Sequence, residues 1–287
     1  MRVMSKITAG AAGTITLGDL TVNRMGYGAM RLTGQGIWGE PKDPEGARRV
    51  LRRAVELDVN FIDTADSYGP EVSERLIREA LWPYPADLVI ATKGGLLRDG
   101  PDIWRPDGRP SHLRNALEGS LGRLGLERID LYQFHRPDPK VPFEESVGEL
   151  VRLKDEGKIR HIGLSNVDAE QLDQALAMTE IVSVQNRYNL SDRASERVLD
   201  KCNSLGIAFL PWFPLAASLL TRAESRVAAV ASEHRATPGQ LALAWLLARS
   251  PVVLPIPGTS SVEHLEENIA AASITLTRSD VELLAAA

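Results

Sequence analysis

The sequence predicts an α/β fold, a single (β/α)8 TIM barrel preceded by an N-terminal β-hairpin. Short apolar runs alternate with amphipathic helical runs along the chain, and from residue 24 onward there are eight such strand–helix units. Many of the apolar runs are continuous, which is typical of strands buried on both faces of a parallel sheet. The 287 residues also suit one such barrel, because eight units take about 250 residues.

The first half of the chain supplies the hairpin and four units. The hairpin is expected over residues 14–23, because Gly18 and Asp19 separate two short β-rich runs. The next apolar runs predict strands at residues 24–30, 59–62, 87–91 and 130–134. The helices after them are expected at residues 44–58, 71–81, 111–124 and 143–156. In the first helix, Ala47, Val50 and Leu51 begin an apolar stripe with i, i+3, i+4 spacing.

The second half repeats the alternation. Its apolar runs predict strands at residues 159–163, 181–184, 207–210 and 252–255. Periodic apolar positions predict helices at residues 169–178, 194–205, 222–234, 238–248 and 262–271. No linker, low-complexity segment or shift in composition interrupts the chain, so we expect one domain over residues 1–287. A doubly wound open sheet is less consistent with the sequence, because the glycines at 26 and 28 lack the third glycine of a GxGxxG motif.

Composition excludes several classes of function. The net charge is −5, and its 33 basic and 38 acidic residues form no basic stripe, so we expect no nucleic-acid partner. No apolar run is long enough to span a membrane, and residues 1–13 lack the apolar segment of a secretory signal. Cys202 is the only cysteine, which excludes an internal disulfide and a CxxC metal site. We expect a soluble, cytoplasmic protein, either a monomer or a small homo-oligomer.

Polar and aromatic side chains occur where the predicted strands end. In a barrel of this kind the carboxyl ends of the strands meet at one rim, which carries the active site. The predicted strand ends carry Asp63, Lys93, His135, Ser165 with Asn166, Gln185 with Asn186, Trp212, and the segment 257–261. Such a concentration of functional groups at one position of the repeat indicates an enzyme.

The chemistry of this rim is acid–base chemistry. The chain has no HExxH motif and no paired Cys or His spacing, so we expect no metal. Tyr68, five residues after Asp63, adds a phenol, whose pKa in water is about 10. We expect the Lys93 ammonium to lower the pKa of the phenol, and Asp63 to keep Lys93 charged and oriented. His135 could then hydrogen-bond a substrate oxygen from the other side.

Six motifs in chain order carry a family resemblance. They are Asp63-Thr64-Ala65-Asp66-Ser67-Tyr68-Gly69, Thr92-Lys93, Phe134-His135, Gly163-Leu164-Ser165-Asn166, Val184-Gln185-Asn186 and Pro257-Gly258-Thr259. With them the chain resembles an aldo-keto reductase over essentially its whole length. The resemblance implies reduction of aldehyde or ketone carbonyls to alcohols with NADP(H). It also implies that Tyr68 is the proton donor, that Asp63 and Lys93 tune it, and that His135 orients the carbonyl.

The resemblance further implies a nicotinamide cofactor site. Ser165, Asn166 and Gln185 would hold the nicotinamide carboxamide, and Trp212 would stack on the ring. The residues implied at the adenosine end are Gly258, Thr259, Ser260, His264, Glu267 and Asn268. Residues 250–277 contain no Lys or Arg, although NADP-binding relatives usually place one there to contact the 2′-phosphate. We therefore expect NADP, with NAD as the alternative.

The substrate and two rival functions remain open at this stage. Met30, Trp38 and Trp104 lie at or after predicted strand ends and are expected to wall the substrate pocket. The chain also resembles a bacterial branch that includes pyridoxal reductases, in residues 26–30 and 256–261, which makes pyridoxal a candidate among small-molecule carbonyl substrates. The rivals are a non-catalytic nicotinamide-binding redox sensor of the same fold and a Schiff-base aldolase that uses Lys93.

Overall fold

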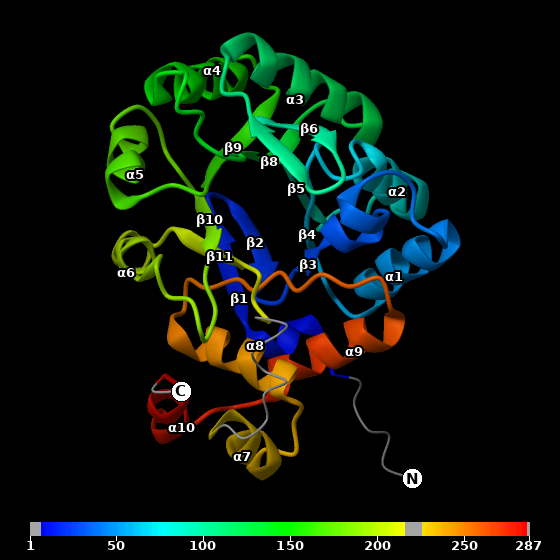
Figure 1. Cartoon of the computed structure of the whole chain (residues 1–287), viewed down its shortest axis with the longest axis vertical. Coiled ribbons are helices and arrows are strands. Elements are labelled where there is room, and N and C mark those ends of the chain that lie inside the picture. Colours follow the sequence, from blue (N-terminus) through cyan, green and yellow to red (C-terminus); the bar gives the residue numbers. More distant parts are fainter. Residues whose placement is uncertain (1–6, 216–225, 286–287) are drawn as a thin grey trace.

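The computed structural model describes residues 7–215 and 226–285. Within these residues, seven parallel strands form the central sheet. In space the strands follow the order β11-β10-β9-β8-β5-β4-β3, and the sheet curls around an interior core (Figure 1). In chain order they are β3 (Tyr27–Gly28), β4 (Phe61–Asp63), β5 (Val89–Gly94), β8 (Ile129–Phe134), β9 (Ile159–Ser165), β10 (Ser183–Arg187) and β11 (Ala208–Trp212). All neighbouring pairs in this sheet are parallel.

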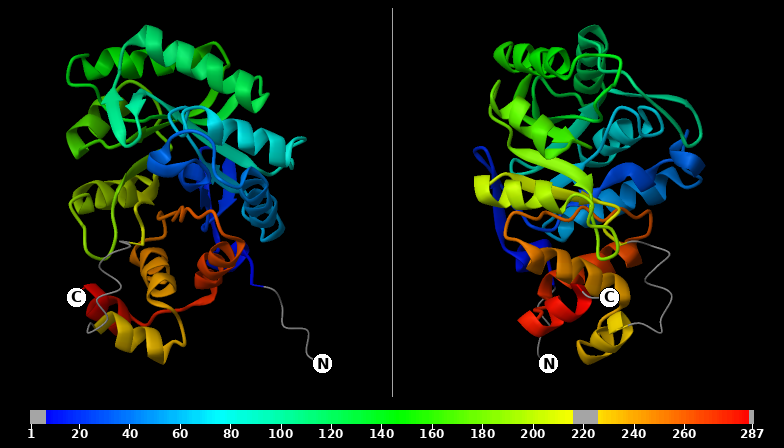
Figure 2. Two further views of the ribbon diagram at one scale, coloured as in Figure 1. Left: turned by 45° about the vertical axis from the view of Figure 1, so that its right-hand side comes forward. Right: turned by 60° about the vertical axis from the view of Figure 1, so that its left-hand side comes forward.

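Helices surround the sheet on its outer side (Figures 1 and 2). They are α1 (Pro44–Glu56), α2 (Val72–Leu81), α3 (Pro110–Leu124), α4 (Phe143–Asp155), α5 (Ala169–Leu176), α6 (Glu196–Leu205), α7 (Arg226–Glu233), α8 (Pro238–Arg249), α9 (Val262–Ala270) and α10 (Arg278–Ala285). Helix α10 was not predicted from the sequence. Of the helix predicted at 222–234, residues 222–225 lie outside the described residues. None of the helices in the described ranges is long and apolar enough to cross a membrane.

Local signals in the sequence explain where several helices begin and end. The Asp43 side chain accepts a hydrogen bond of 2.8 Å from the Gly46 amide, so it satisfies a free donor at the start of α1. Thr237 and Gln240 form a capping box at the start of α8. Helix α3 ends at Gly125, which has a φ of 68° and takes the left-handed conformation that glycine tolerates best.

The eighth strand expected at residues 252–255 is not found as a regular strand. Val253 makes only an isolated parallel bridge with Phe209 of β11. On the other side of this segment, the Gly26 amide donates to the Pro255 carbonyl at 2.9 Å. The bonds on this side continue with the Gly28 amide, which donates to the Pro257 carbonyl at 3.4 Å, but Pro255 and Pro257 have no amide hydrogen and cannot donate back to β3. The described part of the chain therefore forms seven regular parallel strands and, in place of the eighth, an extended segment.

Two hairpins flank the sheet. β1 (Thr14–Leu17) and β2 (Leu20–Asn23) form an antiparallel pair. A second antiparallel pair, β6 (Leu96–Gly100) and β7 (Ile103–Pro106), directly follows β5. The sequence predicted no strands there. Because β6–β7 starts at the carboxyl end of β5, it rises on the side of the sheet where the predicted active site lies.

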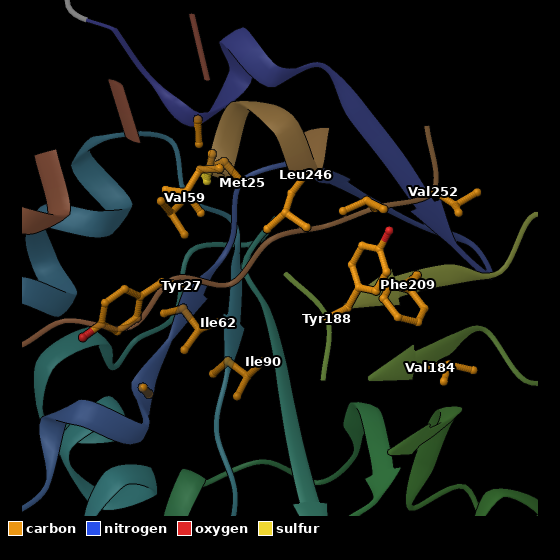
Figure 3. Close-up of a cluster of buried hydrophobic side chains, with 14 of the residues drawn as sticks. Met25, Tyr27, Val59, Ile62, Ile90, Val184, Tyr188, Phe209, Leu246 and Val252 are labelled. Carbon is orange, nitrogen blue, oxygen red and sulfur yellow. The ribbon is translucent and has the colours of Figure 1, made fainter. Parts of the chain in front are cut away.

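Buried side chains fill both faces of the sheet. On the outer face, Tyr188 stacks on Trp245 with ring centroids 5.9 Å apart and meets Phe209 edge-on at 5.8 Å; Tyr188 and Phe209 are labelled in Figure 3. An inner cluster joins Leu17 and Leu20 of the first hairpin to side chains inside the sheet, such as Val89. The first hairpin therefore packs on the interior near the start of the strands, which leaves their carboxyl ends for a pocket.

Candidate active site

The carboxyl ends of the parallel strands line one cavity of about 370 Å³. A cavity of this volume is within the usual range for small-molecule sites. The predicted site residues that line it are Asp63, Tyr68, His135, Ser165, Asn166, Gln185, Trp212, Gly258, Met30 and Trp104. Lys93 lies directly beneath the cavity and is fully buried. The parallel register brings these residues together, because it aligns the ends of neighbouring strands.

Lys93 is the cation at the centre of the site. Its Nζ donates to Asp63 Oδ2 at 2.6 Å, to the Thr64 carbonyl at 2.9 Å and to Tyr68 Oη at 3.4 Å. These bonds use all three donors of the ammonium. The ammonium is therefore held in one position, in contact with both the carboxylate and the phenol.

Asp63 is fixed by two amides as well as by Lys93. Its Oδ1 accepts from Gln133 Nε2 at 2.9 Å and from Gln185 Nε2 at 2.8 Å. Gln133 was not predicted from the sequence, although a polar residue within the apolar run of β8 was a signal for it. The amide nitrogen of Gln185 thus orients Asp63, and the role of Gln185 at the cofactor stays a prediction.

Burial dominates the titration of the phenol. It raises the pKa of Tyr68 above its usual value of about 10, and this effect outweighs the opposite influence of the Lys93 ammonium. Lys93 thus acts in the predicted direction, but burial, which the prediction did not include, makes the net change in the pKa of Tyr68 an increase. Burial alone would lower the pKa of Lys93, but contact with Asp63 and Tyr68 raises it. At neutral pH the site thus holds a protonated phenol and a charged ammonium.

His135 is a neutral imidazole at neutral pH. Burial lowers its pKa well below the usual value of about 6.5, and the charges of Lys93 and Arg136 act in the same direction. Its ring meets the Tyr68 ring edge-on with centroids 5.9 Å apart, and its Nδ1 lies 3.4 Å from Ser67 Oγ. A neutral imidazole has one N–H to donate, so His135 can offer a hydrogen bond to an oxygen beside Tyr68.

The Asn166 side chain hydrogen-bonds three neighbouring residues of the site. It has a positive φ of 59°, a conformation that asparagine tolerates better than most residues. Its Nδ2 donates to the His135 carbonyl at 2.9 Å and to Ser165 Oγ at 3.0 Å. Its Oδ1 accepts from Trp212 Nε1 at 3.1 Å. Although Asn166 lines the cavity, its amide is committed to neighbouring residues.

Aromatic and apolar side chains wall the mouth of the cavity. The Trp104 ring lies edge-on to Tyr68 and His135, with centroids 6.4 and 6.5 Å away. Met30 also lines the cavity, whereas Trp38 is 37% exposed and does not line it. Trp38, predicted as a pocket wall, instead lies behind the wall, with its ring centre 5.7 Å from the guanidinium carbon of Arg98. The segment 213–215 after β11 does line the cavity and was not predicted.

The residues predicted for the adenosine end lie largely outside the cavity. Of that set, only Gly258 lines it. A Cβ at Gly258 would lie 2.7 Å from the Gly28 carbonyl oxygen, so glycine permits this close approach of two backbones. The others lie on the loop after Gly258 and on helix α9; they are Thr259, Ser260, His264, Glu267 and Asn268. Glu267 Oε1 accepts from Thr237 Oγ1 at 2.6 Å and is thereby tied to the start of α8.

The lining residues fit the nicotinamide end of a dinucleotide. Trp212 offers an aromatic surface, and the Ser165 hydroxyl and the Gln185 side-chain carbonyl are groups that pair with a carboxamide. The adenosine end has no Lys or Arg between residues 250 and 277, so a 2′-phosphate would depend on hydroxyls and backbone amides there. The donor set therefore fits a nicotinamide cofactor.

A phenol supported by an ammonium, beside a neutral imidazole at the strand ends of a parallel α/β sheet, is an acid–base site suited to a carbonyl oxygen. A sequence profile described as the Aldo/keto reductase family matches residues 24–287. The chain belongs to this family of oxidoreductases, as its six motifs had indicated.

Several proteins are similar over most of the chain. An uncharacterized oxidoreductase of Schizosaccharomyces pombe is 54% identical, over 95% of this chain and 89% of that protein. The pyridoxine 4-dehydrogenase of Escherichia coli is 44% identical and covers 93% of this chain and 95% of its own. A solved aldo/keto reductase from Klebsiella pneumoniae, in complex with NADP and acetate, has a TM-score of 0.80 and 28% identity, and covers 94% of this chain and 93% of its own.

Proposed function

We propose that this protein is an NADP(H)-dependent reductase that converts aldehyde or ketone carbonyls to alcohols, with Tyr68 as the proton donor. The observation that carries the proposal is the position of Lys93 Nζ, which lies 2.6 Å from Asp63 Oδ2 and 3.4 Å from Tyr68 Oη. This arrangement places a protonated phenol, with a cation behind it, at the base of a cavity that fits a small carbonyl compound.

The protein's own groups would manage the proton and the charge. When bound, the reduced nicotinamide supplies a hydride to the carbonyl carbon. Tyr68 donates its phenolic proton to the carbonyl oxygen, and Lys93 stabilises the negative charge that develops on the phenol oxygen. His135, as a neutral donor, hydrogen-bonds the same carbonyl oxygen and orients it toward Tyr68. The Trp104 side chain, which lies edge-on to Tyr68 and His135, limits the access of water to these two groups.

The cofactor proposal has two parts. Trp212, Ser165 and Gln185 would hold the nicotinamide, as their place in the cavity supports. The choice of NADP over NAD rests on the usual cofactor preference of the family and on similarity to the Klebsiella pneumoniae protein solved with NADP. Fluorescence titration with NADPH and NADH separates the two, since the expected result is tighter binding of NADPH. Tighter binding of NADH would reverse the assignment.

Pyridoxal is the specific substrate that we propose to test first. The support is the 44% identity to the pyridoxine 4-dehydrogenase of Escherichia coli. We expect NADPH oxidation on addition of pyridoxal, followed in a panel with other aldehydes. Turnover of other aldehydes without pyridoxal would remove this substrate and leave the reaction class intact.

The structure gives no support to a Schiff-base aldolase. Such an enzyme needs a neutral lysine amine, usually one whose pKa is lowered by burial or by a neighbouring cation. Here Asp63 and Tyr68 raise the pKa of Lys93, and all three of its donors are engaged. The amine is thus kept charged and cannot attack a carbonyl carbon.

Replacing Tyr68 tests the proposed function. Tyr68→Phe removes the acid and keeps the ring, so NADPH oxidation with the best aldehyde should fall by a factor of about 10² to 10⁴. Tyr84→Phe is the matched control, because its hydroxyl donates to the Leu124 carbonyl at 2.8 Å, far from the cavity. A Tyr68→Phe protein with the wild-type rate would show that another group protonates the substrate.

A further inference from the structure

Arg98, on hairpin β6–β7, uses every donor it has on backbone carbonyls. Its five N–H groups donate to the carbonyls of Ile37 (2.6 Å), Gly36 (2.8 Å), Ser67 (3.1 Å), Gly100 (3.2 Å) and Ile103 (3.2 Å). Within the described residues, no acidic side chain forms an ion pair with it. An arginine that donates all its side-chain hydrogen bonds to main-chain oxygens fixes the backbone around it.

These carbonyls belong to three segments that border the cavity. Gly36 and Ile37 lie in the turn after β3, and Ile37 lines the cavity. Ser67 immediately precedes Tyr68, the proposed acid. The remaining two carbonyls belong to hairpin β6–β7 itself. Arg98 therefore joins the turn, the acid-bearing loop and the hairpin at one point.

The same guanidinium also holds the aromatic wall of the pocket. Its central carbon lies 3.7 Å from the centre of the Trp104 ring, which is close stacking contact. Trp104 in turn lies edge-on to Tyr68 and His135. The position of the indole relative to the two reacting groups thus depends on Arg98.

The turn that Arg98 binds is conformationally strained. Gly36 has a φ of 68°, and Ile37 has a φ of 55°, which is rare for a β-branched residue. Such backbone persists only where its surroundings hold it in place. Arg98 donates to the carbonyls of both residues, and the Asp102 amide donates to Gly36 O at 2.9 Å. The hairpin therefore holds a strained wall against the cavity.

We propose that Arg98 is a specificity-determining positioning residue, which fixes Ile37 and Trp104 as a rigid apolar wall against the carbonyl substrate. The inference rests on the proposed reductase function and assigns the substrate side of the site. Arg98 acts through these two residues and does not itself line the cavity. Its loss should weaken productive substrate binding and relax discrimination by size, while the cofactor residues on β9 to β11 keep their positions.

Steady-state kinetics with a variant pair tests this role. Arg98→Met removes all five donors, and we expect KM for a small aldehyde to rise about tenfold or more, because misplaced walls lose orientation. Arg98→Lys keeps the charge and up to three donors, so its KM should lie between the KM values of the wild type and of Arg98→Met. The NADPH Kd should stay within about twofold of the wild type in both. The ratio of kcat/KM for small over bulky aldehydes should fall in Arg98→Met.

Arg105→Met is the matched control, because Arg105 lies on the same hairpin but pairs with Asp99 in solvent at 2.9 Å. It should leave KM unchanged. Gly36→Ala provides an independent route: a Cβ there would lie 2.8 Å from Pro101 Cβ and must push the turn off the hairpin. We expect the same rise in KM without any change to the guanidinium.

The outcomes separate the inference from the proposed function. If the wild type turns over carbonyls and both Arg98→Met and Gly36→Ala keep its KM and size preference, Arg98 has no positioning role. If Arg98→Met loses NADPH binding together with substrate binding, its role is general structural support and the inference is overturned. If the wild type oxidises no NADPH with any carbonyl, the proposed function fails and the inference fails with it.

Discussion

Replacing Lys93 with Met isolates the electrostatic support of the acid. In the proposed transition state the phenol oxygen of Tyr68 gains negative charge 3.4 Å from Lys93 Nζ. With an effective dielectric constant of about 20, the attraction between two full charges at the 3.4 Å separation is about 5 kcal/mol. The carboxylate of Asp63, 2.6 Å from the same nitrogen, opposes part of it. Since about 1.4 kcal/mol is a tenfold rate, we expect kcat to fall by about 10² to 10³.

The assay must separate a slow enzyme from an unstable one. Lys93→Met leaves the buried Asp63 carboxylate without its cation, which by itself destabilises the fold. The double variant Asp63→Asn with Lys93→Met removes that orphaned charge and should recover stability, measured by urea denaturation, without recovering kcat. NADPH titration of each variant reports whether the cofactor site is intact. A Lys93→Met enzyme that keeps kcat within about threefold of the wild type refutes the role given to the ammonium.

Two further predictions concern pH and stability. The raised pKa of Tyr68 keeps the phenol protonated into the alkaline range, and the lowered pKa of His135 keeps the imidazole neutral at pH 6.5 and above. We therefore expect kcat/KM for reduction to be flat from about pH 6.5 to 9.5. Arg123 Nε donates to the fully buried Glu74 at 2.6 Å, so Arg123→Met should reduce the free energy of unfolding by about 2 to 3 kcal/mol.

Each of these has a clear contrary result. A break in kcat/KM near pH 6.5 would mean that an imidazole with an ordinary pKa controls the reaction, contrary to the burial of His135. For the stability prediction, Arg128→Met is the control, because Arg128 is exposed and its loss should change the unfolding free energy by less than about 0.5 kcal/mol. Equal urea midpoints for Arg123→Met and the wild type would contradict the account of the buried pair.

The sequence predicted best those features that follow from periodicity and parallel register. Lys93 and Asp63 could be placed together because neighbouring parallel strands end at the same edge, and the structure puts them in direct contact. The sequence-based prediction failed where backbone geometry determines the structure. The segment expected as the eighth strand has the right apolar pattern, but Pro255 and Pro257 cannot donate to β3, and which neighbour these two positions face is visible only once the neighbouring strands are known.

The unpredicted parts of the site depend on contacts that spacing does not encode. Gln133 is one polar residue in an apolar strand, and its sequence alone does not show that it faces Asp63. Arg98 hydrogen-bonds backbone carbonyls, which every residue has, so the sequence pattern does not predict which residues it contacts. The lowering influence of Lys93 on the pKa of Tyr68 was predicted with the right sign, but the net increase was not, because the depth of burial that outweighs the Lys93 charge emerges only from the folded chain.

Transfer of an isotopic label tests the central claim, that a protonated Tyr68 and a reduced nicotinamide act on one carbonyl group. Wild-type protein and Tyr68→Phe are incubated with NADPH carrying deuterium at the transferred position of the nicotinamide, together with an aldehyde. We predict one deuterium on the alcohol carbon of the wild-type product and a rate at least about 100-fold lower for Tyr68→Phe. An alcohol without deuterium, or equal rates for the two proteins, would contradict the account.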